Sequence, residues 1–392
     1  MEKVRYGIIG LGNQGSTYVL KIFDQGKAND AYVSAMCDIN PERIEAIRNQ
    51  TVNKDAVYFT DYIEMLDSGL CDAVLIEVPH YQHPEMVMEC LKRGIGVICE
   101  KPAGVYAKQV REMNEYAGTK DAKFGMMFNQ RTNCVYRKMR ELIADGRIGE
   151  IQRVTWIITS WYRTQKYYDG GSWRATWDGE GGGVLINQYP HQLDLVQWVT
   201  GMLPKYVRGF CQYGKWHDIE VEDEVTAYFE YDNGATGMFI TTTGEAPGTN
   251  RFEVSGTKGK LLCENNELYL YENAEDTAIH SRTAKQGFSK PKCEVIKVET
   301  DGKNPQHAGI INNFTAALLG TEELFVCGTD GIAGVQLMNA IEMSGWLGGE
   351  KVELPVDEDR YLEMLNRYRA TSKQKTVTES TVESTEGTYG GK

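Results

Sequence analysis

Short apolar strands alternate with amphipathic helical patterns through the first 125 residues, and this alternation constrains the fold more than any other feature. The stretches "VRYGIIG", "DAVLIEVP" and "GVICEKP" each precede a segment with helical periodicity, such as "PEMVMECLKRG". Strands that are apolar on both faces belong to a parallel sheet that helices cover on both sides. We therefore predict an α/β fold whose N-terminal Rossmann domain spans residues 1–125.

The first predicted strand continues into the sequence "GIIGLGNQG", which places Gly10, Gly12 and Gly15 in G-x-G-x-x-G spacing. The first glycine permits a tight turn, the second lets the backbone approach a pyrophosphate, and the third lets the helix pack on the strand. The N–H groups at the start of the helix, which we expect from about Ser16, then face the phosphates. We expect this loop, including Asn13 and Gln14, to bind a dinucleotide.

Asp38 ends the second predicted strand, and it has the position of the acid that recognises the cofactor's ribose. An acid there accepts hydrogen bonds from the ribose hydroxyls and repels a 2′-phosphate, so NAD is predicted in preference to NADP. Asp38 is also a candidate cap for the helix that starts near Pro41, and the two roles are compatible. Because Arg43 lies nearby, NADP is disfavoured but not excluded.

The pattern changes after residue 125. Segments such as "EDEVTAYFEYDNGATGMFITTT" and "CEVIKVET" predict antiparallel strands, and Asn233-Gly234 is a hairpin turn signal. Helical patterns follow near residues 307–319 and 329–347. Residues 126–370 are therefore predicted to form an α+β domain for substrate binding and oligomerisation, built on an open, mostly antiparallel sheet. Residues 371–392, rich in Thr, Ser and Glu, are predicted to be a disordered tail.

Charge and cysteine usage limit the classes of partner and compartment. A net charge of -13 without clustered Lys and Arg argues against a nucleic-acid partner. No apolar run approaches the roughly 18 residues that span a bilayer, and a strand at the N-terminus leaves no room for a signal peptide. Nine cysteines, never spaced as C-x-x-C, favour reduced thiols over disulfides or zinc. We expect a cytoplasmic protein without a metal site or a membrane partner.

Lys101 follows another strand end, in the sequence Glu100-Lys101-Pro102. The carboxyl ends of strands in such a sheet face the cofactor crevice, so Lys101 is predicted to point toward the nicotinamide. An ammonium in a partly dry pocket can have a lowered pKa and can donate a hydrogen bond to a substrate oxygen. A solvated lysine at a strand end is the alternative interpretation for a lysine considered alone.

Four segments taken together, "GIIGLGNQG", "EVPHYQHPEM", "CEKPAG" and "GGGVLINQYPHQLDL", resemble the glucose–fructose oxidoreductase, inositol dehydrogenase and rhizopine catabolism (Gfo/Idh/MocA) family. The resemblance covers nearly the whole chain apart from the tail. It implies a Rossmann domain, a C-terminal α/β domain with an open sheet, and NAD(P)-dependent chemistry on sugars, cyclitols and their derivatives. It also implies homodimers or homotetramers formed through the sheet.

The resemblance assigns roles to individual residues. Lys101 corresponds to the family's lysine and His191 to its general acid/base, whereas Asn187 stands where many members have an Asp. Glu100 belongs to the same cofactor-side motif as Lys101. Pro79 and His83 match the segment that lines the nicotinamide side, with His80 where Asn is more common.

His191 has the properties of a base for alcohol oxidation, which needs a neutral group within hydrogen-bond reach of the hydroxyl. Pro190 is tolerated in the first turn of a helix, and Gly201 would end that helix. In the first turn, the positive end of the helix dipole disfavours imidazolium and keeps the ring neutral. A packed or capping histidine is the alternative for an isolated His.

Asn187 follows the glycine-led segment 181–186, which we expect to be strand-like. The amide cannot take a proton, but it can orient the substrate hydroxyl or Lys101, so proton transfer falls to His191. Asp194 lies about one helical turn after His191, and it either orients the imidazole or lies at the surface.

Aromatic residues crowd the segment "TSWYRTQKYYDGGSWRATWDGEGGG". They could form a wall against the C–H faces of a sugar or an aromatic aglycone, with about half of them serving instead as core anchors or subunit contacts. The aromatics and neighbouring arginine are Trp161, Tyr162, Arg163, Tyr167, Tyr168, Trp173 and Trp177. Asn129 and Arg131 are expected near the crevice, and Arg163 with Arg174 leaves open an acidic substituent on the substrate.

Three functions are compatible with these features. The first is an NAD-dependent dehydrogenase acting on a ring hydroxyl or ketone of a sugar, glycoside or cyclitol. The second is an enzyme that oxidises a glycoside transiently, cleaves or epimerises it, and keeps its recycled NAD bound. The third is a non-catalytic NAD(P)-binding regulator, against which the presence of both Lys101 and His191 counts.

Overall fold

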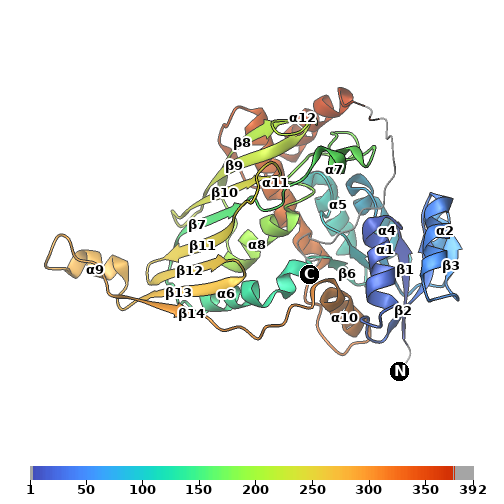
Figure 1. Ribbon diagram of the computed structural model, residues 1–392, viewed down its shortest axis with the longest axis horizontal. Helices are drawn as coiled ribbons and strands as arrows, with labels where there is room; N and C mark the ends of the chain where they lie inside the picture. Colours follow the sequence, from blue (N-terminus) through green and yellow to red (C-terminus); the bar gives the residue numbers. More distant parts are fainter. Residues whose placement is uncertain (1–2, 374, 376–392) are drawn as a thin grey trace.

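The computed structural model describes residues 3–373 and 375, and it contains two sheets with helices packed between them (Figure 1). Helix α11 (Gly331–Trp346) contacts α5 (Ala107–Ala117) on one side and strand β8 (Tyr206–Tyr213) on the other. The two halves of the molecule therefore share an extensive packed boundary.

The first sheet is parallel throughout, as predicted. Its strands follow the order β3 (Val57–Phe59), β2 (Ala31–Cys37), β1 (Val4–Ile9), β4 (Ala73–Ile76), β5 (Gly96–Cys99) and β6 (Phe124–Met126). The order reverses between β1 and β4, which is where open α/β sheets bind ligands at the carboxyl ends of their strands. The remaining helices of this half are α1 (Asn13–Thr17), the π-helix Tyr18–Phe23, α2 (Pro41–Gln50), α3 (Tyr62–Asp67) and α4 (His83–Lys92). Strand β3 and helix α3 were not predicted, because β3 has only three residues and is partly exposed.

The second sheet has nine strands and is mostly antiparallel, as predicted, but β7 and β10 pair in parallel. The order is β14 (Cys293–Lys297), β13 (Glu267–Asn273), β12 (Gly259–Glu264), β11 (Asn250–Gly256), β7 (Ile151–Ile158), β10 (Thr236–Thr242), β9 (Glu222–Glu230), β8 and β15 (Val352–Glu353). The predicted hairpin at Asn233-Gly234 joins β9 to β10, and Gly234 adopts a φ of 83°.

Helices cover one face of this sheet (Figure 1). They include α6 (Cys134–Ala144) and α8 (Pro190–Thr200), which contact each other, and α11. The predicted late helices are confirmed as α10 (Gln306–Leu318) and α11. Helix α10 returns to the first sheet, where the hydroxyl groups of Thr315 and Tyr6 are hydrogen-bonded at 2.9 Å. The shorter helices are α7 (Gln165–Asp169), α9 (Thr277–Thr283) and the 3-10 turns His80–Gln82, Asn129–Thr132 and Gly328–Asp330. The longer helix α12 (Glu358–Ala370) was not predicted.

The segment 181–186 is not strand-like, so that expectation was wrong. Its backbone bonds locally, because Asn187 N donates to Gly183 O at 3.0 Å and Tyr189 N donates to Val184 O at 3.1 Å. The chain therefore curls into turns before α8, and the apolar run is buried within them.

The predicted tail, residues 371–392, lies outside the described residues apart from 371–373 and 375. Ser372 donates a hydrogen bond to Glu220, and the Lys373 amide donates to the same carboxylate at 2.9 Å. All nine cysteines lie within the described residues and are free thiols. Over residues 3–373 and 375, we find no helix with the length and apolar character needed to cross a membrane.

Candidate active site

The glycine loop between β1 and α1 has the geometry of a dinucleotide cradle. A Cβ on Gly10, whose φ is +94°, would lie 2.2 Å from Glu77 O, and one on Gly15 would lie 1.9 Å from Gly10 O. Gly12 faces open space, since the nearest atom to its Cβ position is an Arg43 nitrogen at 4.0 Å. The outer two glycines thus allow tight packing, and the middle one leaves the backbone open to a ligand. Helix α1 begins at Asn13, earlier than predicted.

Asp38 connects this loop to the end of β2. Its carboxylate accepts hydrogen bonds from Leu11 N at 2.8 Å and Asn40 N at 2.8 Å, and it pairs with Arg43 at 3.5 Å. The cap of α2 is Asn40, whose side chain accepts from Glu42 N at 2.8 Å. Asp38 is therefore not the helix cap, and its carboxylate stays beside the glycine loop, where an acid can meet a ribose.

Two further carboxyl groups, of Glu77 and Glu100, follow β4 and β5, and the Glu77 carboxyl oxygens and the Glu100 side chain are buried behind the loop. Glu100 accepts hydrogen bonds from Tyr18 and from Lys101 N, the latter at 3.0 Å. Neither carboxyl oxygen of Glu77 has a partner among the described residues. Burial raises the pKa of both groups. Unpartnered buried acceptors call for a donor, and a ligand seated on the glycine loop can supply one, so these residues fit a bound dinucleotide.

Lys101 bridges the two halves of the site. Its ammonium donates a hydrogen bond to Asn187 O at 2.9 Å, so it is not a freely solvated lysine. Burial lowers the pKa of Lys101, whereas the neighbouring carboxylates of Glu100 and Glu180 raise it. The ammonium is thus held at the carboxyl end of β5, directed at the segment that precedes α8.

The Asn187 side chain is the centre of a polar network. Its Nδ2 donates to Glu180, and its Oδ1 accepts from the Tyr167 hydroxyl at 3.2 Å. Arg174 in turn donates to the Tyr167 hydroxyl at 2.6 Å, and Gln188 donates to it at 3.1 Å. The amide therefore connects an acid, a phenol and, through its backbone carbonyl, Lys101.

His191 occupies the first turn of α8, as predicted, and Gly201 ends this helix with a φ of 69°. The imidazole is buried, its edge faces Phe128 at a centroid distance of 6.4 Å, and Nδ1 has no partner among the described residues. Burial, with smaller contributions from Lys101 and His307, lowers the pKa of His191 well below its ordinary value. The ring is consequently neutral at physiological pH and has a nitrogen free to accept a proton.

Asp194 neither orients His191 nor lies at the surface, so both expectations for it were wrong. It is buried and forms a two-pronged ion pair with Arg131, with Oδ2 2.8 Å from Nε and Oδ1 2.5 Å from Nη2. Arg131 also pairs with Asp330 at 2.6 Å. The guanidinium donates to both carboxylates and holds α8 against the turn Asn129–Thr132, and its contact with a substrate stays a prediction. Asn129 donates to Gln306 at 2.6 Å, and its Oδ1 has no partner among the described residues.

The histidines after β4 lie in the same region. His83 places its two ring nitrogens 2.7 Å from Pro102 O and 2.8 Å from Val78 O, so it ties together the segments that follow β4 and β5. Pro79 precedes the 3-10 turn that carries His80. Burial lowers the pKa of both histidines. Through these backbone carbonyls, and through Glu180 O for His80, the two rings hold the loops around Lys101.

The predicted aromatic residues fall into two groups. Tyr168 and Trp177 are core anchors: the Tyr168 hydroxyl bonds to Thr243 at 2.7 Å, and Trp177 packs on Trp346 at a centroid distance of 5.6 Å. The other group stays near the polar network. Trp161 stacks on Tyr189 and lies under Arg163, Trp173 lies under Arg174 and meets the edge of His80, and Tyr162 is half exposed.

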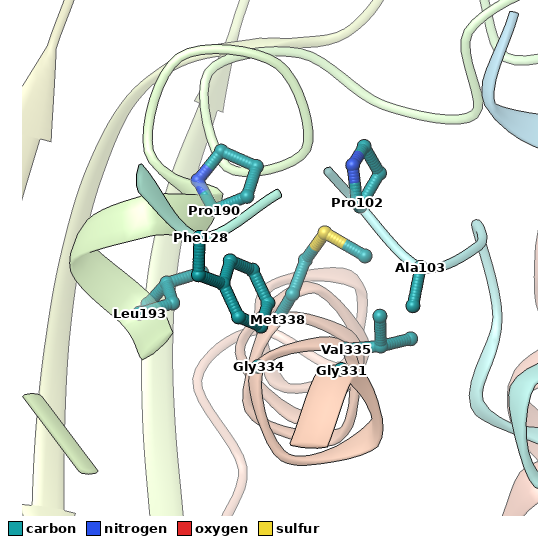
Figure 2. A pocket seen from close by; sticks show the side chains of 9 residues that line it. All are labelled: Pro102, Ala103, Phe128, Pro190, Leu193, Gly331, Gly334, Val335 and Met338. Atoms are coloured by element: carbon teal, nitrogen blue, oxygen red, sulfur yellow. The ribbon is translucent and has the colours of Figure 1, made fainter. Parts of the chain in front are cut away.

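A small apolar pocket underlies the site (Figure 2). Pro102, which follows Lys101, and Pro190, which precedes His191, face each other across it, with Met338 of α11 between them (Figure 2). No charged or amide side chain lines this pocket, so it supports the two site loops and does not recognise a polar substrate.

Two glycines, Gly182 and Gly183, bring the segment 181–183 against buried groups of the second half. A Cβ on Gly182 would lie 2.7 Å from Glu342 Oε1, and one on Gly183 would lie 2.0 Å from Glu222 O. The Glu222 carboxylate accepts the Gly183 N–H at 2.9 Å and the Leu185 N–H at 3.1 Å. The Glu222 carboxylate therefore accepts N–H groups that a neighbouring strand would otherwise bond. It fixes the backbone that leads to Asn187 and His191.

Glu180 and His307 were not among the predicted site residues. Glu180 is 2% exposed and bonds Asn187, and His307 lies at the start of α10, with an electrostatic effect on His191. Burial, with a smaller contribution from Lys101, lowers the pKa of His307 to about 4. A polar residue directly before the glycine run was the only available signal for Glu180, and nothing in the local sequence placed His307 beside α8.

Two family models match the chain. The model described as an oxidoreductase family with an NAD-binding Rossmann fold matches residues 4–128, and the GFO/IDH/MocA C-terminal domain model matches residues 136–262. Together they cover well over half of the chain. The matches include the positions from Gly10 to His191 discussed above, except those in the connection 129–135.

Individual relatives agree with these models. The inositol 2-dehydrogenase of Rhizobium meliloti (strain 1021) is 26% identical over 341 residues, which is 86% of this chain and 95% of its own. The 1,5-anhydro-D-fructose reductase of Ensifer adhaerens is 25% identical over 261 residues, 67% of this chain and 76% of its own. Among solved structures, the WlbA dehydrogenase from Bordetella pertussis in complex with NADH and UDP-GlcNAcA has 25% identity and a TM-score of 0.74, covering 91% of this chain and 100% of that one.

Proposed function

Because the chain belongs to the Gfo/Idh/MocA family of oxidoreductases with an NAD-binding Rossmann domain, we propose that it transfers a hydride between NAD and a ring carbon of a sugar, glycoside or cyclitol. The reacting group is a ring hydroxyl in one direction and a ketone in the other. His191 acts as general acid/base, and Lys101 polarises the reacting oxygen. The observation that supports this most is the hydrogen bond of the Lys101 ammonium to Asn187 O, four residues before a buried histidine, His191, whose Nδ1 has no partner among the described residues and whose pKa Lys101 helps to lower.

Each residue has a defined part in the oxidation of an alcohol. Bound NAD supplies the hydride acceptor. Lys101 donates a hydrogen bond to the substrate oxygen and so stabilises the negative charge that develops on it. His191 takes the hydroxyl proton on a ring nitrogen, which its lowered pKa keeps available at neutral pH. Asn187 holds Lys101 through its backbone carbonyl.

The substrate class is proposed from the walls of the site and from the relatives. Trp161, Trp173 and Tyr167 offer apolar faces beside hydrogen-bonding groups, a combination that suits the C–H faces and hydroxyls of a cyclic polyol. The names of the two relatives, an inositol dehydrogenase and an anhydrofructose reductase, support a cyclic polyhydroxylated compound. Arg163 and Arg174 add positive charge, so we include sugars with an acidic substituent.

We propose NAD in preference to NADP, because Asp38 is buried beside the glycine loop and Arg43 is already paired with it. A 2′-phosphate would have to displace that pair and would meet the Asp38 charge. We also propose a homodimer or homotetramer formed through the second sheet, in the cytoplasm. The outer face of this sheet carries exposed apolar side chains, including Phe210 at 53% and Met238 at 41%, and a second copy of the chain would cover them.

The test is a substrate screen with purified protein. Excess NAD is mixed with a panel of inositols, free sugars, sugar acids and O- and C-glycosides, and reduced nicotinamide is followed by its absorbance. A rise with one class of compound is the expected result. No rise, with NADH recovered from the denatured protein after exposure to a glycoside, replaces this proposal with transient oxidation by a retained cofactor. The absence of both signals for every compound contradicts catalysis by this site.

A further inference from the structure

The Asn187 amide has one allowed orientation, because its two ends face groups of different chemistry. Its nitrogen faces the Glu180 carboxylate, and its oxygen accepts from the Tyr167 hydroxyl and from Gln188, both at 3.2 Å. A carboxylate only accepts hydrogen bonds, so the nitrogen has to lie on the Glu180 side.

Glu180 is itself fixed and enclosed. The carboxylate is 2% exposed, and its second oxygen accepts the Ala175 N–H at 2.6 Å. Burial raises the pKa of Glu180, while the positive charges of Arg174 and Lys101 lower it. Two cations and two N–H donors thus offset the cost of burying this charge.

An aspartate at position 187 would be incompatible with this arrangement. Its carboxylate would take the place of the amide nitrogen and meet the Glu180 carboxylate at hydrogen-bond distance, and one of the two would then have to be protonated. Asn187 and Glu180 are therefore complementary: the acid is at position 180 and the donor at position 187.

We propose that Glu180 is a positioning residue of the active site, which fixes the Asn187 amide and provides a counter-charge for the Lys101 ammonium. This inference rests on the proposed function and adds to it a residue outside the His191 and Lys101 pair. The connection is short, because the residue whose side chain bonds Glu180 also accepts the Lys101 ammonium through its backbone carbonyl at 2.9 Å.

The electrostatic part of the role follows from the groups around Lys101. Burial lowers the pKa of Lys101, and the Glu180 carboxylate is one of the negative charges that oppose this effect. Removing that charge would favour the neutral amine, so Lys101 would lose its proton at a lower pH. The charged and titratable groups that interact with Lys101 are Glu77, Glu100, Glu180, Arg174, His80, His83, His191 and His307.

The first test is a double-mutant cycle on the hydrogen-bonded pair. The variants Glu180→Gln, Asn187→Asp and Glu180→Gln/Asn187→Asp are assayed for kcat/KM with the substrate found in the screen. We expect each single variant to lose about 10- to 100-fold, because a buried polar group loses its partner or gains a like charge. The double variant exchanges the acid and the amide, so it should recover at least tenfold over the worse single variant. Full activity of Glu180→Gln, or no recovery in the double variant, overturns the proposal.

The second test is independent of turnover. The Lys101 amine is titrated by NMR in protein with labelled lysine side chains, and its signal is identified by its loss in Lys101→Arg. We expect the pKa of Lys101 to fall by about one unit in Glu180→Gln and to stay unchanged in Glu141→Gln, a surface control paired only with Lys138. An unchanged pKa in Glu180→Gln overturns the proposal.

This titration separates the present inference from the proposed function. If the wild-type protein turns over no compound but the pKa of Lys101 falls in Glu180→Gln, the catalytic proposal fails and the role of Glu180 is supported. If the wild-type protein is active, the pH profile adds a third readout: the alkaline limb of kcat/KM should move to lower pH in Glu180→Gln, and an unmoved limb counts against the proposal.

Discussion

Two glycine-rich segments build the site, and they use glycine for different reasons. In the first, Gly10 and Gly15 are required by backbone atoms of their own loop and of the adjacent strand end. In the second, Gly182 and Gly183 are required by Glu342 and Glu222, which come from distant elements. In the first segment the contact that requires Gly15 lies within the loop itself, whereas both contacts that require the glycines of the second segment depend on how the chain folds. We also assign different functions to the two segments: cofactor binding to the first, and proton transfer to the region around the second.

The largest expected effect concerns what holds α8 in place after the second segment. In Asp194→Asn the Arg131 charge loses its main partner inside the protein, so the free energy of unfolding should fall by about 3–5 kcal/mol. Urea unfolding measures this. The matched control is Asp330→Asn, whose side chain is 38% exposed and pairs with the same arginine; it should cost under about 1 kcal/mol. Equal losses of unfolding free energy in the two variants would mean that the buried Arg131–Asp194 pair stabilises the protein no more than the exposed Arg131–Asp330 pair.

The next largest effect concerns the glycines themselves. It tests whether cofactor binding and proton transfer belong to separate segments. Gly183→Ala places a Cβ 2.0 Å from Glu222 O, so the segment must shift, and a displacement of about 1 Å can cost roughly 100-fold in turnover. NAD affinity, measured by calorimetry, should remain within about twofold, because the first loop is untouched. Gly15→Ala places a Cβ 1.9 Å from Gly10 O and should weaken NAD binding first. A loss of NAD affinity in Gly183→Ala would show that the second segment also contributes to cofactor binding.

Asp38→Ala tests whether Asp38, beside the first segment, sets the preference for NAD over NADP. The variant removes the acceptor expected for the ribose hydroxyls and releases Arg43, so the ratio of kcat/KM for NAD over NADP should fall by about tenfold or more. Initial rates with the two cofactors give the ratio. Arg43→Ala serves as the companion variant and should leave the preference for NAD in place. An unchanged ratio in Asp38→Ala would remove the basis for our cofactor assignment.

The last expected effect is a pH dependence set by Glu222 beneath the second segment. Burial raises the pKa of Glu222 to about 7, well above the value of about 4.3 in an unfolded chain. The folded protein thus keeps this proton while the unfolded chain releases it, and the associated stability is lost as pH rises from about 4 through 7.

The neutral variant Glu222→Gln isolates this contribution. The difference in unfolding free energy between wild type and Glu222→Gln should move against the wild type by about 1–3 kcal/mol between pH 5 and pH 8. Denaturant unfolding at several pH values measures it, with Glu141→Gln as the control that follows the wild type. A pH-independent difference would show that Glu222 does not titrate in this range.

The elements that the sequence predicted well are those with strong periodicity and local turn chemistry. The parallel strands of the first half appear as continuous apolar runs, and the glycine loop and Gly201 each follow from rules that involve only neighbouring residues. Strand β3 and helix α3 were missed because each is short. The glycine-led segment before Asn187 was predicted as a strand since its side chains are apolar, but its N–H groups find a carboxylate in place of a second strand.

The site was predictable only in part, for a physical reason. Lys101 and His191 were singled out from their places at a strand end and a helix start together with the resemblance to the family. The pairing of Arg131 with Asp194, and of Glu180 with Asn187, joins residues whose proximity is decided by tertiary packing. No periodicity encodes such pairs, so the role of Asp194 was assigned wrongly, and the ion pair of Arg131 and the place of Glu180 were overlooked.

Proton transfer by His191 is tested most directly by measuring NAD binding and turnover together in wild type and in His191→Ala. NAD affinity is determined by calorimetry, and formation of reduced nicotinamide is followed with the substrate identified in the screen. We predict equal NAD affinity in the two proteins and a loss of turnover of about 100- to 10,000-fold in the variant, since a general base contributes a factor of this size. Wild-type turnover in His191→Ala, with NAD still bound, would contradict the assignment of proton transfer to the region around the second glycine segment.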